Sequence, residues 1–360
     1  MNTVLTTQIE IQKDALMNSR QVQSNIELDG HQNAVILEVQ KFGFSANNIT
    51  YALLGERFGY WGFFPASEGY GITPVWGFAK VVQTNTEQLK IGELVYGYLP
   101  MATHLLIHAD KISEQGFTDV HPQRKSISPV YDHYLRCNAD PTYAEVAETW
   151  ILTFRPLFTT SFVLAYALAD RMQAHKGNVF LTSASSKTAY GTAQILRIIM
   201  PDVRLVGLTS EGQVDFVNQT GCYDDVVSYD EIDSHSVGEH DWLLDFAGDQ
   251  VRLNRLRNGH KLAMERTLLI GATDVEAQGF RDKLAIGGVF FAPDEVRKFN
   301  KEWGPTEFQK RYFQHWQSFV KHFKPLLNEQ SESGALAIID QFQQFLNGKV
   351  NPKMMHVLTF

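Results

Sequence analysis

The sequence predicts an α/β protein of two domains, a β-rich one followed by a doubly wound parallel sheet. A length of 360 residues fits two domains of ordinary size. Up to about residue 150, short β-like runs are separated by turn signals, whereas from about residue 156 strand-like and helix-like segments alternate. The later strand-like runs are continuously apolar, which is typical of parallel strands that helices cover on both faces.

The first domain is predicted from apolar runs that resemble strands. Three of them are NAVILEVQKFGFS at 33–45, PVWGFAKVVQT at 74–84 and ELVYGYLPMATHLLIHA at 93–109. Ile91-Gly92 supplies a turn before the third run, and HLLIHA within that run fits a half-buried strand. We therefore expect a β-rich domain over residues 1–155, completed by residues 325–360.

The second domain is predicted from segments that alternate along the chain. A helical stretch at 159–172 precedes VFLT at 179–182, and the helix AYGTAQILRIIM follows at 189–200. Then come strand-like RLVGLT, DVVSY, WLLDFAG, TLLIGAT and GGVFFAP, with a helix around GQVDFVNQTG. This order predicts βαβ crossovers over residues 156–324. The tail holds an amphipathic helix, GALAIIDQFQQFLNGK, and a strand-like MMHVLTF, which are expected to return to the first domain.

Composition limits the classes of protein to consider. The two cysteines, Cys137 and Cys222, exclude a disulfide framework and a four-cysteine zinc site, and they fit a reducing cytoplasm. The net charge is −8 with scattered basic residues, so the sequence predicts no nucleic-acid partner and no anionic membrane partner. No secretory signal and no apolar run near the roughly 20 residues of a membrane span are evident.

The loop between VFLT and the next helix is the candidate phosphate site. A strand, a polar loop and a helix start commonly hold phosphates, because first-turn N–H groups and the helix dipole attract anions. The loop here, with Ser183, Ser185, Ser186, Lys187 and Thr188, lacks the usual glycines, but its hydroxyls and ammonium group can supply donors. The alternative interpretation is a serine N-cap beside a solvated lysine. A P-loop is disfavoured because both of its required glycines are missing.

Ordered motifs along the chain resemble the medium-chain dehydrogenase/reductase superfamily, in its zinc-free quinone and enoyl reductase branch. The matching segments are SANNITYALLGE, PVWGFAKVV, RPLFTTSFVLAYAL, VFLTSASSKTAYGTAQILR, TGCYDDVVSYDE, WLLDFAGD and FLNGKVNPKMMHVLTF. More closely, the sequence is similar to an uncharacterised branch known mainly as a domain of unknown function. The resemblance implies a GroES-like β-rich catalytic domain and a Rossmann-type cofactor domain.

Departures from the superfamily pattern bear on the metal. Where zinc-dependent relatives carry a Gly-His-Glu segment, this sequence reads Trp76-Gly77-Phe78, with no ligand. We therefore expect no catalytic metal. The histidines His104, His121 and His133 are expected to be isolated, without metal-ligand spacing.

Hydride transfer without a metal suits an activated double bond, which needs a proton donor. In the enoyl reductases of this superfamily the acid is a tyrosine, and the resemblance implies Tyr60 as the candidate, with Tyr51 as the alternative. Aromatic packing is the competing interpretation for both. Asn47 and Asn48 are candidates for substrate binding, although turn residues of this kind need no further function.

The choice between NADPH and NADH depends on the end of RLVGLT. Ser210, after Thr209, resembles the serine that zinc-free relatives use for the 2′-phosphate, while Glu211 would oppose that phosphate. The basic partner expected a few residues later is absent, and Lys187 could compensate for it. We expect NADPH, with NADH possible, and we include Gly271 among the cofactor-binding residues.

Taken with the resemblance, these residues predict an NAD(P)H-dependent reductase that transfers hydride to an enone, a quinone or an enoyl thioester. One alternative is a cofactor-binding pseudoenzyme, which the missing glycines favour. Another is a reductase of a ketone or thioester-tethered biosynthetic intermediate. The resemblance also implies a small-molecule substrate and a homodimer, joined through the strand around GGVFFAP at 287–293.

Overall fold

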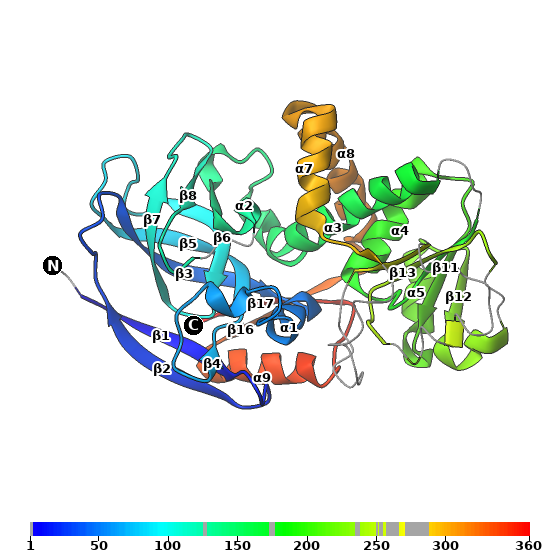
Figure 1. The fold of residues 1–360 in the computed structure, drawn as a ribbon, viewed down its shortest axis with the longest axis horizontal. Coiled ribbons are helices and arrows are strands. Elements are labelled where there is room, and N and C mark those ends of the chain that lie inside the picture. The colour runs from blue at the N-terminus through cyan, green and yellow to red at the C-terminus, as the bar shows by residue number, and fades with distance from the viewer. Residues whose placement is uncertain are drawn as a thin grey trace. The chain divides into compact units, whose positions relative to one another are not determined.

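The chain divides into two compact units, seen in a computed structural model (Figure 1). The structure describes residues 3–124, 128–172, 177–234, 238–249, 251, 255–256, 266–270 and 288–360. Unit 1 comprises Met1–Thr153, Glu329–Val350 and Met355–Phe360, and unit 2 comprises Phe154–Asn328 and Asn351–Met354. Each unit thus contains segments that are distant in the sequence.

Unit 1 is built around a closed antiparallel barrel. Its larger sheet has the order β16-β17-β3-β5-β6-β9-β8-β7, and an additional pairing of β3 with β7 closes the last six strands. The strands are β3 (Ala34–Phe44), β5 (Pro74–Thr84), β6 (Leu94–Pro100), β7 (His104–Asp110), β8 (Gly116–Asp119), β9 (His133–Arg136), β16 (Asn328–Ser333) and β17 (Met354–Thr359). A smaller antiparallel sheet contains β2 (Ser19–Ile26), β1 (Val4–Gln12) and β4 (Tyr70–Gly71).

Short helices connect the strands of unit 1. They are α1 (Ala46–Leu53), α2 (Pro129–Asp132), α9 (Ala335–Leu346) and the 3-10 turns η1 (Tyr60–Gly62), η2 (Cys137–Ala139) and η3 (Glu145–Ala147). The helix α1 begins with a capping box, in which Ser45 and Asn48 satisfy each other's backbone N–H groups. This cap fixes the direction in which the chain leaves β3.

Unit 2 contains a parallel sheet in the order expected of a dinucleotide fold. The order β12-β11-β10-β13-β14-β15 places the first strand of the sheet beside the fourth, so a topological switch point lies between β10 and β13. The strands are β10 (Val179–Leu181), β11 (Leu205–Thr209), β12 (Asp225–Ser228), β13 (Trp242–Asp245), β14 (Thr267–Leu269) and β15 (Gly288–Val289). Their continuous apolar runs are buried, as predicted, apart from edges at β12 and β15.

The helices of unit 2 include two that the sequence analysis did not identify. Helix α3 (Glu148–Met172) continues from unit 1 into unit 2, and α4 (Lys187–Ile199) and α5 (Val214–Thr220) follow β10 and β11; the 3-10 turns are η4 (Glu211–Gln213) and η5 (Tyr229–Ser234). The additional pair is α7 (Ala292–Trp303) and α8 (Pro305–Phe323). Aromatic side chains join this pair to α3, with ring centroids 4.9 Å apart for Tyr166 and Trp303.

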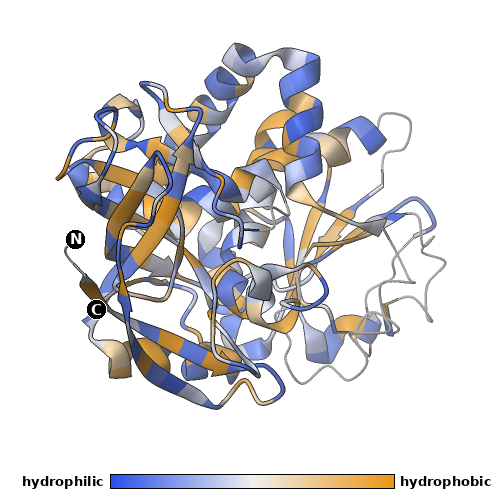
Figure 2. Cartoon of the chain, turned by 60° about the vertical axis from the view of Figure 1, so that its left-hand side comes forward, coloured by the Kyte–Doolittle hydropathy of each residue, from blue (hydrophilic) through white to orange (hydrophobic). Residues whose placement is uncertain are grey.

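Hydrophobic residues, drawn in orange, are concentrated in the strands of both units (Figure 2). Residues 145–172 form a helix that is long and apolar enough to cross a membrane, but 72% of its most apolar window is buried inside the protein. Core helices of globular proteins pass the same test, so this helix is weak evidence for a membrane span.

Candidate functional site

The predicted phosphate loop lies at the carboxyl end of β10, at the switch point of the sheet of unit 2. Strand β10 pairs with β11 on one side and β13 on the other, so the loop at 182–186 emerges between two neighbouring strand ends. In open α/β sheets the crevice at this point is where ligands bind. The fold thus places Ser183, Ser185 and Ser186 where the sequence analysis expected a dinucleotide.

The loop keeps a left-handed turn without a glycine. Ser183 has a φ of 47°, a region that glycine normally occupies. The Ser183 N–H donates to the Tyr229 hydroxyl at 2.6 Å, and the Ala184 N–H donates to the Leu208 carbonyl at 2.9 Å. Gly207 makes this approach possible, because a Cβ there would lie 3.0 Å from the Cβ of Ala184. The sequence analysis did not identify Tyr229, whose hydroxyl accepts the Ser183 N–H of the loop.

The first turn of α4 begins with a serine cap and two open backbone N–H groups. Ser186 is its N-cap and its side chain accepts the Ala189 N–H at 3.3 Å. The serine N-cap of the alternative interpretation is therefore present. The N–H groups of Lys187 and Thr188, at the first two helical positions, have no partner among the residues that the structure describes. Open first-turn donors and the helix dipole both favour a phosphate at this point.

Lys187 is held near the loop by a contact with the C-terminal segment of unit 2. Its ammonium group donates to the Pro352 carbonyl at 3.4 Å. Burial lowers the pKa of Lys187 to about 8, because the charged form loses hydration. A phosphate bound beside the amine would offset that loss, so the lysine is suited to an anionic ligand.

The end of β11 lies against the same loop. The buried Thr209 hydroxyl and the Ser185 hydroxyl are 3.5 Å apart, which brings two predicted cofactor residues together. Ser210 and Glu211 follow at the surface. Gly271, also predicted to bind the cofactor, lies outside the described residues.

Thr182 and Asp245 form a buried hydrogen bond beside the switch point, which the sequence analysis did not predict. The Thr182 hydroxyl donates to Asp245 Oδ1 at 2.6 Å and accepts the Phe246 N–H at 2.9 Å. Asp245 also accepts the N–H groups of Ala247 and Gly248, at 3.2 and 3.1 Å. Because Asp245 is fully buried, these bonds fix the loop after β13 relative to the loop after β10.

In unit 1, the two candidate acids belong to one group of aromatic residues, here called the tyrosine cluster: the buried Tyr51, Tyr60, Tyr98 and Tyr131 and the half-buried Trp76. The rings of Tyr51 and Tyr60 are 4.6 Å apart between centroids. The Tyr60 and Tyr131 hydroxyls are 3.4 Å apart, and Trp76 Nε1 donates to the Tyr51 hydroxyl at 3.2 Å. Trp76, in the segment that resembles the Gly-His-Glu position of zinc-dependent relatives, is thus a member of this cluster.

The tyrosines of this cluster stay protonated. Burial raises the pKa of Tyr51, with the nearby Tyr60 acting in the same direction. Burial also raises the pKa of Tyr60, which is 6% exposed, although its hydrogen bond with Tyr131 opposes the change. A neutral phenol is a proton donor, so either residue has the protonation state that the predicted acid requires.

The two asparagines have different surroundings. The buried Asn48 side chain accepts the Ser45 N–H at 2.9 Å and donates to the Pro74 carbonyl at 3.0 Å, so both ends of the amide are engaged in structure. Asn47 is half-buried and its side chain lies near the Tyr51 hydroxyl. Neither lines the cavity of about 620 Å³ in unit 1, which is formed by the 61–70 segment with Lys13, Pro122 and Gln123.

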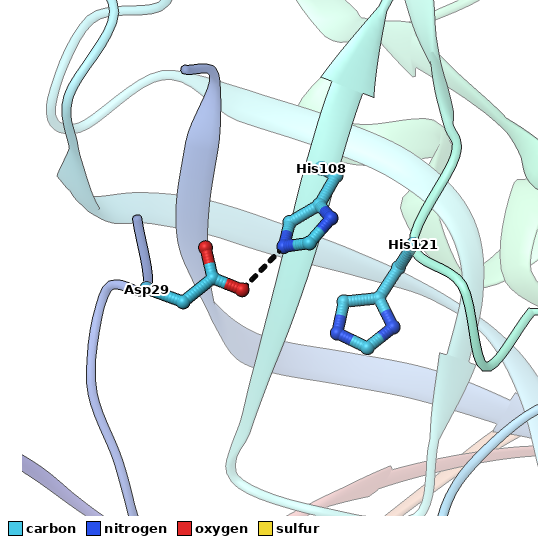
Figure 3. A group of neighbouring side chains, drawn as sticks. All are labelled: Asp29, His108 and His121. Atoms are coloured by element: carbon cyan, nitrogen blue, oxygen red, sulfur yellow. Dashed lines mark hydrogen bonds and ion pairs between the residues drawn. The ribbon is translucent and has the colours of Figure 1, made fainter. Parts of the chain in front are cut away.

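The expectation that His121 is isolated is wrong. His121 is not isolated: its ring centroid is 4.4 Å from that of His108, and His108 Nε2 is 2.6 Å from Asp29 Oδ2 (Figure 3). Partial burial would raise the pKa of Asp29, but hydrogen bonds from the His31 backbone and His108 hold it below its usual value. Burial lowers the pKa of His121, and the Arg124 charge adds to this. Sequence spacing could not reveal the grouping.

Solved structures share this fold at low sequence identity. CurA from Vibrio vulnificus in complex with NADPH has a TM-score of 0.62 at 14% identity, over 98% of each chain. TarJ from S. aureus in complex with NADPH has a TM-score of 0.56 at 13% identity, over 99% of this chain and 100% of that one. A mutant enoyl thioester reductase from Candida tropicalis has a TM-score of 0.54 at 13% identity, over 99% and 100%.

These likenesses confirm the predicted fold, a β-rich domain and a domain with a parallel sheet. No curated protein matches the chain in sequence. Residues 42–351, however, match a family described as a protein of unknown function, DUF2855. This agrees with the uncharacterised branch that the sequence predicted. The chain therefore belongs to the DUF2855 family.

Proposed function

We propose that the chain is an NADPH-dependent reductase that transfers hydride to an activated carbon–carbon double bond, in an enone, a quinone or an enoyl thioester. The observation that carries the proposal is the first turn of α4, whose open N–H groups lie beside Lys187 at the switch point of a dinucleotide-type sheet. The neighbours add support, since CurA and TarJ are described with NADPH and two others as enoyl reductases.

The residues of the loop are suited to the charged part of the cofactor. Ser185, Ser186 and Thr188 would hold the pyrophosphate together with the first-turn N–H groups of α4. Thr209 and Ser210 would bind the adenosine ribose, and Lys187 would pair with the 2′-phosphate of NADPH. Glu211 acts against that phosphate, so Lys187 is the residue on which the preference for NADPH depends.

Bound NADPH would supply the hydride, and the chain would supply the proton. Hydride adds to the β-carbon of the substrate, charge builds up on the conjugated carbonyl oxygen, and the α-carbon then takes a proton. We assign that proton to the Tyr60 phenol, with Tyr51 as the alternative. The neighbouring Tyr131 hydroxyl can share a proton with Tyr60. Asn47 would contact the substrate. The segment Trp76-Gly77-Phe78, which offers no metal ligand where zinc-dependent relatives carry Gly-His-Glu, supports a reaction that uses no catalytic metal.

The proposal is tested with the purified 360-residue chain. NADPH should raise the melting temperature of the protein, and the fluorescence of NADPH should change when it binds. NADH should bind more weakly. NADPH oxidation is then followed with crotonyl-CoA, but-3-en-2-one and 1,4-benzoquinone as acceptors. Loss of NADPH absorbance with one of them supports the proposal. If neither nucleotide changes the melting temperature or fluorescence, the proposal is wrong.

Two alternative functions predict different results in these NADPH assays. A cofactor-binding protein without catalysis is favoured by the Tyr229 hydroxyl, which already occupies the Ser183 N–H in a loop without glycines. It predicts NADPH binding with no hydride transfer to any acceptor. A reductase of a ketone or thioester-tethered intermediate would deliver deuterium from labelled NADPH to a carbonyl carbon instead of a β-carbon.

The assembly and compartment belong to the same proposal. The strand β15 is the last strand of the described parallel sheet, and we propose that it extends that sheet across a homodimer. Both cysteines are buried free thiols, which fits the cytoplasm.

A further inference from the structure

We propose that Asp29, His108 and His121 bind one divalent transition-metal ion, with Zn²⁺ as the preferred ion. One ligand atom from each residue lies within 4.8 Å of the other two, and the three side chains point toward one another (Figure 3). This metal site shares no residue with the dinucleotide loop or the tyrosine cluster, so it is independent of the proposed reductase activity.

The fold of unit 1 fixes the two histidines beside each other. His108 lies on β7, and His121 follows two residues after the end of β8. These strands pair in the antiparallel sense with Ala109 opposite Asp119, and the Val120 N–H donates to the His108 carbonyl at 2.9 Å. His108 is therefore held within a strand, and His121 is held just beyond the strand that pairs with it.

The buried carboxylate of Asp119 holds the backbone of both histidines. Asp119 Oδ1 accepts the backbone N–H of His108 at 3.0 Å and that of His121 at 2.9 Å. Its other oxygen lies 3.1 Å from Arg124 Nε, and both side chains of this ion pair are almost fully buried. Supporting groups that hold the ligands in position are typical of metal sites.

Asp29 approaches from the connection between β2 and β3. Its Oδ1 accepts the His31 N–H at 3.0 Å, and the His31 ring stacks on His108 with centroids 4.0 Å apart and planes 2° from parallel. The Asp29 side chain is 41% exposed, whereas that of His108 is 7% exposed. The carboxylate can therefore adjust to an ion while the imidazole stays in place.

Two imidazole nitrogens and one carboxylate oxygen suit a tetrahedral Zn²⁺ ion with water in the fourth position. An ion would take the place of the hydrogen bond between His108 Nε2 and Asp29 Oδ2, which is 2.6 Å long. A proton on Nε2 moves to Nδ1 through solvent, so the neutral imidazole offers its Nε2 lone pair to the ion, and no redox change is involved. The bound ion would join the connection between β2 and β3 to the β7–β8 pair.

The test uses the full chain after removal of metals with a chelator. Co²⁺ is titrated in and followed by its visible absorption, and Zn²⁺ is then added as a competitor. We expect one ion per chain in the wild type, displaced by Zn²⁺. The Asp29→Asn and His121→Gln variants should bind at least tenfold more weakly. His104→Gln, on the same strand but outside the metal site, is the matched control and should bind as the wild type does.

Folding and function are checked separately. Circular dichroism confirms that the variants fold, and Asp29→Asn, an exposed and nearly isosteric change, keeps the test valid if His121→Gln does not. EDTA should lower the melting temperature of metal-loaded wild type and His104→Gln only. NADPH binding should be equal in all variants. Absence of Co²⁺ binding to the wild type, equal affinity in Asp29→Asn, or an equal loss in His104→Gln would each overturn the metal site.

Discussion

Lys187 is the residue whose charge most directly affects the proposed cofactor preference. Its Nζ contacts the Pro352 carbonyl, and burial holds its pKa at about 8, below the ordinary value of 10.5. Below pH 8 the amine is protonated and attracts a phosphate. Above pH 8 the free protein loses that charge, so the affinity for NADPH should fall as the pH rises.

The size of this effect can be measured by titrating NADPH fluorescence at pH 7.5, 8.5 and 9.5. We expect the dissociation constant to increase by up to about tenfold per pH unit above 8, until the pH reaches the higher pKa of the lysine in the complex. Lys187→Arg keeps its charge and should show a flat profile. Lys187→Ala should weaken NADPH binding more than NADH binding; equal losses would instead place the lysine at the pyrophosphate.

The tyrosine cluster gives the second prediction at this scale. Tyr60→Phe removes the proposed proton donor and leaves the ring in place, so the rate of hydride transfer should fall by about 10² to 10⁴. The NADPH dissociation constant should not change. Tyr51→Phe is the comparison: a larger loss in that variant would identify Tyr51 as the acid, and unchanged rates in both would exclude a tyrosine acid.

The residues that the sequence could locate are those whose geometry is local. Ser186 and Lys187 begin a helix after a strand, and this order alone predicts that they lie at a strand–helix turn, where a phosphate is expected. The metal site could not be found in this way, because Asp29 and His108 are 79 positions apart and meet only through strand pairing. The hydrogen bond between Thr182 and Asp245 was missed for the same reason, although both lie in motifs that the sequence identified.

At the scale of elements, the clearest packing constraint is the position of Trp61 between two glycines. A Cβ on Gly55 would lie 2.0 Å from Trp61 Nε1, and a Cβ on Gly71 would lie 2.2 Å from Trp61 Cε3. The ring therefore joins the end of α1 to the short strand β4. Neither position has room for a methyl group.

Gly71→Ala should accordingly destabilise unit 1 by about 1–3 kcal/mol, because the Trp61 ring must move. The melting temperature should fall by several degrees and the tryptophan emission should shift. Gly62→Ala, next to the tryptophan but with open space around its Cβ, is the control and should change neither. Similar melting temperatures for the two variants would contradict this packing.

The pattern of apolar runs predicted most of the elements, but not their pairing or all of their ends. The runs at β10, β11, β13 and β14 were recognisable because buried parallel strands are apolar throughout. The sequence analysis did not predict helices α7 and α8, because charged residues alternate with the aromatic residues in their sequences, as in KRYFQHWQSFVKHF. Closure of the barrel by β3 and β7 depends on a register that composition does not encode.

For the whole molecule, the proposed homodimer makes a specific demand on β15. The Phe290 N–H donates to the Leu269 carbonyl, and N–H groups of alternate residues point to opposite edges of a strand. The Val289 N–H therefore points away from β14. Proline at position 289 would remove a donor for a partner strand and leave the pairing with β14 intact.

Light scattering should then give twice the chain mass for the wild type and one chain mass for Val289→Pro. Circular dichroism checks that the variant retains its fold. A wild type that is already monomeric, or a variant that remains dimeric, would rule out an interface through this strand.

The pairing of β17 with β3 has a consequence for how the chain acquires its structure. His356 pairs with Phe44, so two neighbours in the barrel sheet are synthesised at nearly opposite ends of the sequence. Contacts of such long range form late, because closing a large loop costs entropy before the contact is gained. Most of unit 2 is one continuous stretch and can complete its core earlier. Until β17 arrives, the Phe42–Phe44 end of β3 has an unpaired edge, so a nascent or refolding chain is exposed to aggregation at that end of the strand.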